Sequence, residues 1–192
     1  MKGVADRRTK TPRDMALSMG VIAVVALVLY GMYGMISFSP GTTTEGQTPT
    51  ADVTGGFQRA ESLVGFPVVI PADLPATWTA NSFSFIDKAA ASVQKPAAVR
   101  AGWLTDQGKF ITIIESNGAV AEVLTAELGG TGSAAGTATV TQPGGTATWS
   151  VTSGRRGEAA WFRTAGDVTY LITGSAAPED FTTLAKAVDS QL

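Results

Sequence analysis

The longest uninterrupted apolar segment of the chain runs from Met15 to Phe38. It contains 24 residues and no charged side chain. At 1.5 Å per residue, a helix of this length reaches about 36 Å, enough to cross a hydrocarbon core of about 30 Å with some tilt. The pattern therefore predicts a single transmembrane helix over residues 15–38.

The residues on either side of this run predict its orientation. Five basic and two acidic residues precede it, whereas residues 39–44 contain no basic residue. Because positive residues stay on the cytoplasmic side, we expect residues 1–14 to be a cytoplasmic tail and the C-terminal bulk to lie outside the cell membrane. The apolar region of a cleaved signal peptide is usually only about 7–15 residues long, so the run favours an uncleaved signal anchor.

A stretch rich in Thr, Gly and Pro, residues 39–56, follows the apolar run. This composition is typical of a flexible tether, which at this length spans roughly 20–25 Å. Residues 57–192 then have the size of one ordinary domain, long enough to bury a core without disulfides. We expect the tether to hold this extracytoplasmic domain close to the outer surface of the cell membrane.

Alternating apolar and polar positions predict that this domain contains a mostly antiparallel sheet. The segment 110–114 is apolar on both faces, as in a central strand that is covered on both sides. The other predicted strands are 66–71, 99–103, 147–151, 159–162 and 168–172. The first of these is bracketed by prolines and so is short or at an edge, and the last three are close enough in sequence to form a meander.

Helical spacing of apolar residues predicts two or three helices packed on this sheet. The clearest begins at Pro178, with two acidic residues in its first turn and an apolar stripe that reaches Leu192. A second starts near Val120 and ends at Gly129, a residue typical of helix ends. A third is expected within residues 57–64. The chain is thus predicted to be an α+β protein, with one transmembrane helix ahead of one domain.

Composition narrows the chemistry that the exported domain can perform. The chain has no cysteine and no histidine, so it lacks disulfides, the usual near-neutral acid–base side chain and the commonest metal ligand. From Ser39 onward it has nine basic and fourteen acidic residues, a net charge of −5. Nucleic acid is not an expected partner, because binding it requires a basic face. No metal or other cofactor is predicted.

Two short motifs have the residues of a catalytic or phosphate-binding site but not its usual context. Residues 92–95 read Ser-Val-Gln-Lys, the spacing of serine–lysine enzymes, yet Pro96 follows at once and would break a helix. The glycine-rich segment Gly130–Gly136 follows a predicted helix, whereas a phosphate loop follows a strand. We expect both segments to be loops. We therefore predict no enzyme activity, and a hydrolase that uses scattered carboxylates remains the enzymatic alternative.

Three side chains are candidate contacts for a ligand or partner. Arg155 and Arg156 form a basic pair at a predicted hairpin tip, where they can meet anionic headgroups or wall polymers, although a solvated turn is the simpler interpretation. Trp78 is the tryptophan expected to be partly exposed. Trp103 and Trp149 fall on predicted inward faces and are expected in the core.

These features favour a non-enzymatic interaction or binding module of the cell envelope, anchored in the cell membrane. Its expected partners are the bilayer and an envelope protein, wall polymer or lipid. The alternative is a lipid-handling domain with an apolar cavity between sheet and helices.

Short motifs in a fixed order also resemble one protein family. They are Arg13-Asp14-Met15, Phe66-Pro67-Val68-Val69-Ile70-Pro71, Leu74-Pro75, Trp78, Gly102-Trp103-Leu104-Thr105, Glu115-Ser116-Asn117-Gly118, Gly174 and Leu184-Ala185. Over nearly its whole length the chain resembles the actinobacterial membrane-anchored family of the domain of unknown function 4245. The resemblance implies a single-pass membrane protein with an exported domain, and it implies no activity and no site residues.

Overall fold

The computed structural model describes residues 19–22, 50–142, 144–154 and 157–192. The chain divides into two compact units, Met1–Gly46 and Gln47–Leu192. In the first unit only residues 19–22 are described, and they are helical and exposed. Among the described residues, no helix has the length and apolar character needed to span a membrane. The predicted tail and almost all of the predicted transmembrane helix lie outside the described residues.

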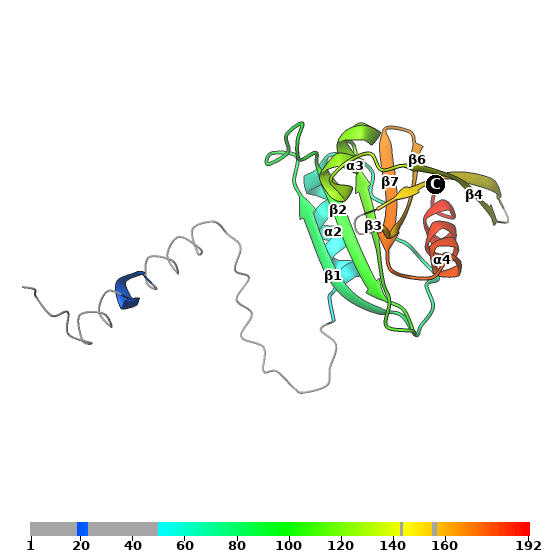
Figure 1. Cartoon of the computed structure of the whole chain (residues 1–192), viewed down its shortest axis with the longest axis horizontal. Helices are drawn as coiled ribbons and strands as arrows, with labels where there is room; N and C mark the ends of the chain where they lie inside the picture. The colour runs from blue at the N-terminus through cyan, green and yellow to red at the C-terminus, as the bar shows by residue number, and fades with distance from the viewer. Residues whose placement is uncertain (1–18, 23–49, 143, 155–156) are drawn as a thin grey trace, which may run out of the picture. The chain divides into compact units, whose positions relative to one another are not determined.

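The second unit is built on one seven-stranded sheet (Figure 1). Its strands are β1 (Thr79–Ile86), β2 (Ala98–Leu104), β3 (Phe110–Ser116), β4 (Ala134–Gln142), β5 (Gly145–Ser153), β6 (Ala159–Ala165) and β7 (Val168–Gly174). They lie in the order β1-β2-β3-β7-β6-β5-β4, and every neighbouring pair is antiparallel. Two meanders, β1 to β3 and β4 to β7, therefore meet where β3 pairs with β7. The α+β class and the antiparallel sheet are confirmed.

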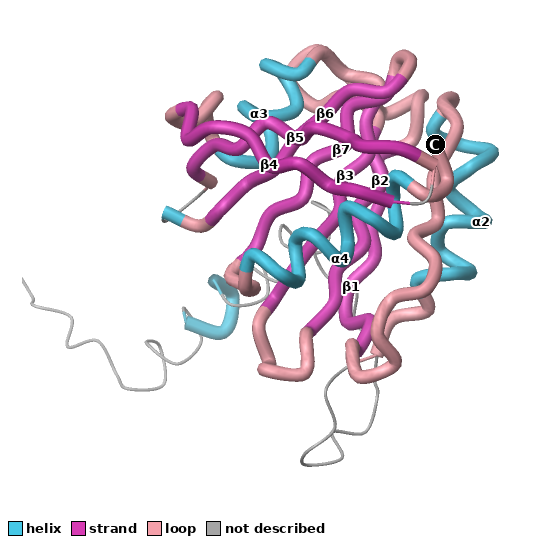
Figure 2. Tube along the Cα trace, turned by 90° about the vertical axis from the view of Figure 1, so that its right-hand side faces the viewer, coloured by secondary structure: helices cyan, strands magenta, loops and turns pink. Residues whose placement is uncertain are grey.

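Helices cover both faces of the sheet (Figure 2). The helices α2 (Val53–Val64) and α4 (Pro178–Asp189) pack on one side, which we call the α2/α4 face, and α3 (Val120–Leu128) packs on the other. Residues of α2 and α4 share one buried cluster with Ile111 and Ile113, whereas residues of α3 share a second cluster with Ile114. Both sides of β3 are thus buried, which confirms the prediction of a central strand.

The ends of the helices follow their sequence signals. The helix α3 ends at Gly129, whose φ of 80° is the left-handed conformation that glycine adopts freely. At the start of α4, Pro178 occupies the first turn and Asp180 accepts a hydrogen bond of 3.2 Å from the amide of Ala177. Both helices are confirmed, although the apolar stripe of α4 does not reach Leu192, whose surface is 53% exposed.

The strand at one edge of the sheet differs from the sequence prediction. Residues 66–71, predicted to be a strand, form a loop. Pro67 and Pro71 lack the amide hydrogens that a sheet ladder needs, which explains the difference. The edge strand is instead β1, where Phe83 and Phe85 share the face that packs on the core.

Two further boundaries shift by a few residues. The helix α2 begins at Val53, because the carboxylate of Asp52 caps it by accepting from the amide of Gly55 at 2.9 Å. The last part of the predicted tether, residues 53–56, is therefore helical. On the other side of the domain, β4 begins at Ala134, within the glycine-rich segment that was expected to be a loop.

Candidate functional site

A loop crosses the α2/α4 face between the two helices. This loop, residues 65–78, links α2 to β1, and we call it the strap. Phe66 and Val69 lie buried in the same cluster as the inward residues of α2 and α4. Prolines within the strap favour an extended backbone. The strap is therefore part of the core, although it has no regular secondary structure.

One buried carboxyl group fastens the strap to the sheet. Glu115 lies on β3, is fully buried, and accepts a hydrogen bond of 2.8 Å at Oε2 from the amide of Val69. Its other oxygen, Oε1, is buried and has no hydrogen-bond partner among the described residues. Burial raises the pKa of Glu115 from 4.5 to about 8, although the bond from Val69 lowers it. The strap anchor is thus a carboxyl group whose burial favours the protonated form near neutral pH.

Glu115 begins a row of polar side chains across the same face. In the strand register it stands beside Tyr170 on β7, which stands beside Arg163 on β6. Arg163 forms an ion pair with Asp189 at the end of α4, and Asp189 also accepts from Trp149 Nε1 at 3.0 Å. Burial and the neighbouring Glu115 raise the pKa of Tyr170 to about 12, although Arg163 lowers it. The row extends from the strap anchor to the last turn of α4.

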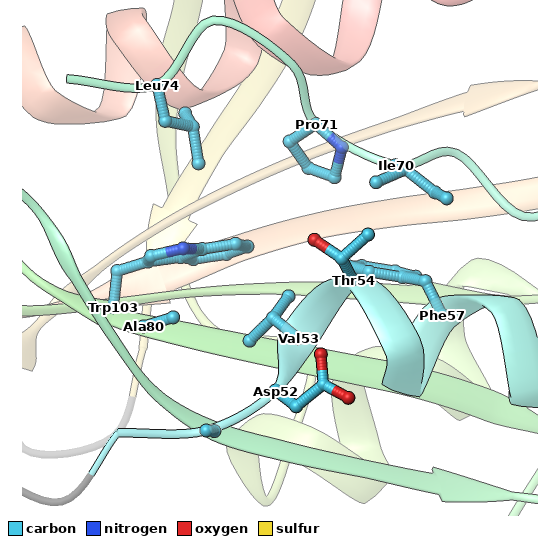
Figure 3. Close-up of a pocket in the computed structure, with 10 residues that line it drawn as sticks. Asp52, Val53, Thr54, Phe57, Ile70, Pro71, Leu74, Ala80 and Trp103 are labelled. Atoms are coloured by element: carbon cyan, nitrogen blue, oxygen red, sulfur yellow. The ribbon is translucent and has the colours of Figure 1, made fainter. Parts of the chain in front are cut away.

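On the α2 side of the strap lies a small hollow, which we call the apolar pocket (Figure 3). Its volume is about 220 Å³. Its apolar walls are formed by Val53, Phe57, Ile70, Pro71, Leu74, Ala80 and Trp103. Asp52, which also lines it, has a side chain that is 71% exposed. The pocket therefore has mostly apolar walls, with Thr54 and the exposed carboxylate of Asp52 also in its lining.

On the α4 side of the strap lies a second hollow, which we call the polar pocket. Its volume is about 320 Å³. It is lined by Ala72, Asp73, Thr141, Gln142, Thr183, Lys186, Ala187 and Ser190. The strap turns there at Asp73, whose φ of 58° is a left-handed conformation that Asp tolerates better than most residues. The strap, β4 and α4 thus bring polar groups together from three distant segments.

Of the three candidate contact residues, only Trp78 lies among the described residues. Trp78 ends the strap, is half-buried, packs against the core and lines neither pocket. Arg155 and Arg156 lie outside the described residues. Trp103 and Trp149 are buried, as predicted, and Trp103 forms a wall of the apolar pocket.

Three side chains of the site, Glu115, Gln142 and Lys186, were not singled out from the sequence. A signal existed for Glu115, because it is the one charged residue of β3. Gln142 and Lys186 carry no such signal, because the polar pocket forms only when distant segments pack together.

The serine–lysine motif lies in a turn, and the glycine-rich segment leads into a strand. Ser92 and Lys95 exchange backbone hydrogen bonds of 2.8 and 3.0 Å across a tight, exposed turn. The segment Gly130–Gly136 leads from α3 into β4. Within the described ranges, no three acidic residues are grouped as metal ligands would be.

No curated protein and no solved structure matches the chain. One family model does match, over residues 7–188, and its description is "Protein of unknown function (DUF4245)". Several of the sequence motifs that resemble this family meet at the site. The strap contains such motifs, and Trp103 and Glu115 each belong to one. The match covers nearly the whole sequence, and the chain therefore belongs to the DUF4245 family.

Proposed function

We propose that the chain is a single-pass membrane protein whose C-terminal domain lies outside the cell and binds an envelope protein through the apolar pocket. The anchor is supported by the apolar run at residues 15–38 and by the basic residues that precede it. The absence of cysteine from the chain offers a clean test of this topology. A membrane-impermeant maleimide applied to intact cells should label an Asp106→Cys variant, in an exposed turn, and leave a Thr9→Cys variant unlabelled. The reverse labelling pattern would contradict the proposed orientation.

The size and lining of the apolar pocket carry the binding part of the proposal. At about 220 Å³ it is smaller than the roughly 300–1,000 Å³ of typical small-molecule sites. A hollow of this size suits one large apolar side chain, the kind of anchor that dominates protein interfaces. It has little room for a lipid chain, so the pocket favours a protein partner over lipid handling.

Charge indicates what should surround that anchor on the partner. The sequence after the apolar run has a net charge of −5. Among the described residues, the ionic neighbour of Asp52 at the pocket rim is Arg59, at 3.9 Å, and both side chains are largely exposed. We therefore expect the partner to present a basic residue beside its apolar anchor, because an exposed carboxylate steers cationic groups toward it.

The buried carboxylates also favour a binding role over hydrolysis. Glu115 has no exposed surface and accepts from the backbone of the strap. Asp189 is held by Arg163 and Trp149, with no exposed side-chain surface. Hydrolysis by paired carboxylates requires both groups to reach a substrate between them.

Site-specific photocrosslinking in living cells tests the partner. A photoreactive residue at position 70 lies on the pocket wall, where Ile70 is 37% exposed. A matched probe at position 93 replaces Val93, which is 69% exposed beside α3 on the other face. We expect a protein adduct from position 70 and none from position 93.

The adduct must also depend on the pocket itself. An Ala80→Leu change should fill the hollow and abolish the adduct at position 70, while the thermal unfolding midpoint shows that the domain remains folded. Adducts with lipid alone, or a protein adduct that survives Ala80→Leu, would contradict the proposed mode of binding.

A further inference from the structure

We infer that the polar pocket is a binding site for one ring of a neutral saccharide. The pocket is separate from the apolar pocket and is formed by other residues, so this inference stands or falls independently of the protein partner. At about 320 Å³ it is within the size range of small-molecule sites. Three segments line it, the strap, β4 and α4, as is usual where a ligand is held from several sides.

Most polar groups of the pocket are hydrogen-bond acceptors. Gln142 donates through Nε2 to the carbonyl of Asp189 at 3.0 Å, which leaves its Oε1 buried and without a partner among the described residues. The hydroxyl groups of Thr183 and Ser190 already donate to carbonyls of α4, at 2.9 and 3.0 Å. Their oxygen atoms therefore remain as acceptors. A buried acceptor without a donor is costly, so the pocket favours a ligand that brings donors.

The two charged residues of the pocket restrict the charge of that ligand. Lys186 supplies an ammonium donor and Asp73 a carboxylate acceptor, and neither takes part in the three ion pairs seen among the described residues. An anion such as phosphate would meet the carboxylate of Asp73, which repels it. A cationic ligand would be repelled by Lys186. A neutral ligand with several hydroxyl groups satisfies both, because each hydroxyl both donates and accepts.

The apolar part of the lining completes the match to a sugar ring. The methyl groups of Ala72 and Ala187 lie among the polar side chains, on the strap and on α4. A sugar ring has a face of C–H groups that can pack on such a surface while its hydroxyl groups point to the polar side chains. A compact polyhydroxylated ring can therefore contact both the alanines and the polar side chains. A lipid chain has no donor and would leave Gln142 Oε1 unpaired.

Saturation-transfer NMR on the full-length chain in lipid nanodiscs tests the inference. The probes are D-glucose, D-galactose, D-mannose and N-acetylglucosamine, with inorganic phosphate and tetramethylammonium as charged competitors. We expect transfer to the ring C–H protons of at least one sugar, with no competition from either ion. Loss of one hydrogen bond to the pocket should weaken binding roughly tenfold in Gln142→Met and in Lys186→Met.

Matched variants separate the pocket from a general effect of the substitutions. Gln94→Met and Lys95→Met make the same changes in an exposed turn and should leave the signal unchanged. Lys186 is exposed, so its variant keeps the test decisive even if Gln142→Met unfolds. Absence of transfer to every sugar, equal transfer in Lys186→Met, or displacement by either ion would overturn the assignment.

Discussion

The pocket on the α2 side of the strap is walled mostly by residues with aromatic and aliphatic side chains, whereas the pocket on the α4 side is lined by six residues with polar side chains and by two alanines. The two helices explain the difference. The first turns of α2 place Val53 and Phe57 toward the sheet beside Trp103. The last turns of α4 bury Val188 and leave Lys186 and neighbouring polar residues at the pocket.

One irregular segment therefore shapes two sites with different linings. The strap contributes Ile70, Pro71 and Leu74 to the apolar pocket and, between them in sequence, Ala72 and Asp73 to the polar pocket. Val69, just before these residues, is held by Glu115. Changes at Glu115 should act on both pockets, whereas changes on α2 or α4 should act on one of them.

Replacing Glu115, the residue that anchors the strap, should have the largest effect on stability. Below its unfolded-state pKa, Glu115 is protonated whether folded or unfolded; between 4.5 and about 8 the folded state alone holds the proton. Stability should therefore fall as the pH rises through this window, by about 5 kcal/mol. A Glu115→Gln variant, neutral at every pH, should lose this dependence and be the more stable protein at pH 9.

Urea unfolding from pH 5 to pH 9 measures this effect, and the absence of histidine removes the usual source of titration in that range. Parallel profiles for the wild type and Glu115→Gln would show that the pKa of Glu115 is not raised in the folded protein.

On the α4 side, Asp189→Ala should have the next largest effect. It leaves the Arg163 guanidinium, which is 22% exposed, without its ion pair, and the indole N–H of Trp149 without an acceptor. The expected loss of stability is roughly 3 kcal/mol. Glu179→Ala removes an exposed carboxylate from the same helix and should cost less than about 1 kcal/mol. Equal losses in the two variants, measured by urea unfolding, would contradict a buried ionic link at the end of α4.

On the α2 side, Gly56→Ala should have a smaller effect that is confined to the apolar pocket. A Cβ atom there would lie 2.5 Å from Cδ1 of Phe83, so either the Phe83 ring or α2 must shift. The expected loss is roughly 1–3 kcal/mol, together with a weaker adduct at position 70. Gly130→Ala meets nothing within 4 Å and should change neither quantity. A weaker sugar signal in Gly56→Ala would show that the two pockets are not independent.

Most regular elements of this fold could be predicted from the sequence, but the two edge strands β1 and β4 and the strap were not predicted. The central strand β3 and the helices α3 and α4 have strong periodic patterns and end signals, and local pattern sufficed for them. The segment 66–71 has the composition of a strand but the hydrogen-bonding capacity of a loop, because of its two prolines. Local composition therefore misidentified the segment on which both pockets depend.

The candidate site could not be predicted from the sequence either, and the reason is physical. The polar pocket requires Gln142 and Lys186 to meet Asp73, and these residues come from β4, α4 and the strap. Glu115 belongs to one of the motifs that resemble the family, but the sequence alone does not indicate that it accepts a hydrogen bond from the amide of Val69 on the strap. Trp103 was predicted to be in the core, and its core position is also what makes it a pocket wall.

The independence of the two pockets is the central claim, and a crossed comparison of two variants measures it directly. Ala80→Leu should abolish the protein adduct at position 70 and leave saturation transfer to the sugar unchanged. Lys186→Met should weaken transfer to the sugar roughly tenfold and leave the adduct intact. The assignment of separate functions to the two sides of the strap is wrong if either variant abolishes both signals. It is also wrong if Ala80→Leu leaves the adduct unchanged and Lys186→Met leaves transfer to the sugar unchanged.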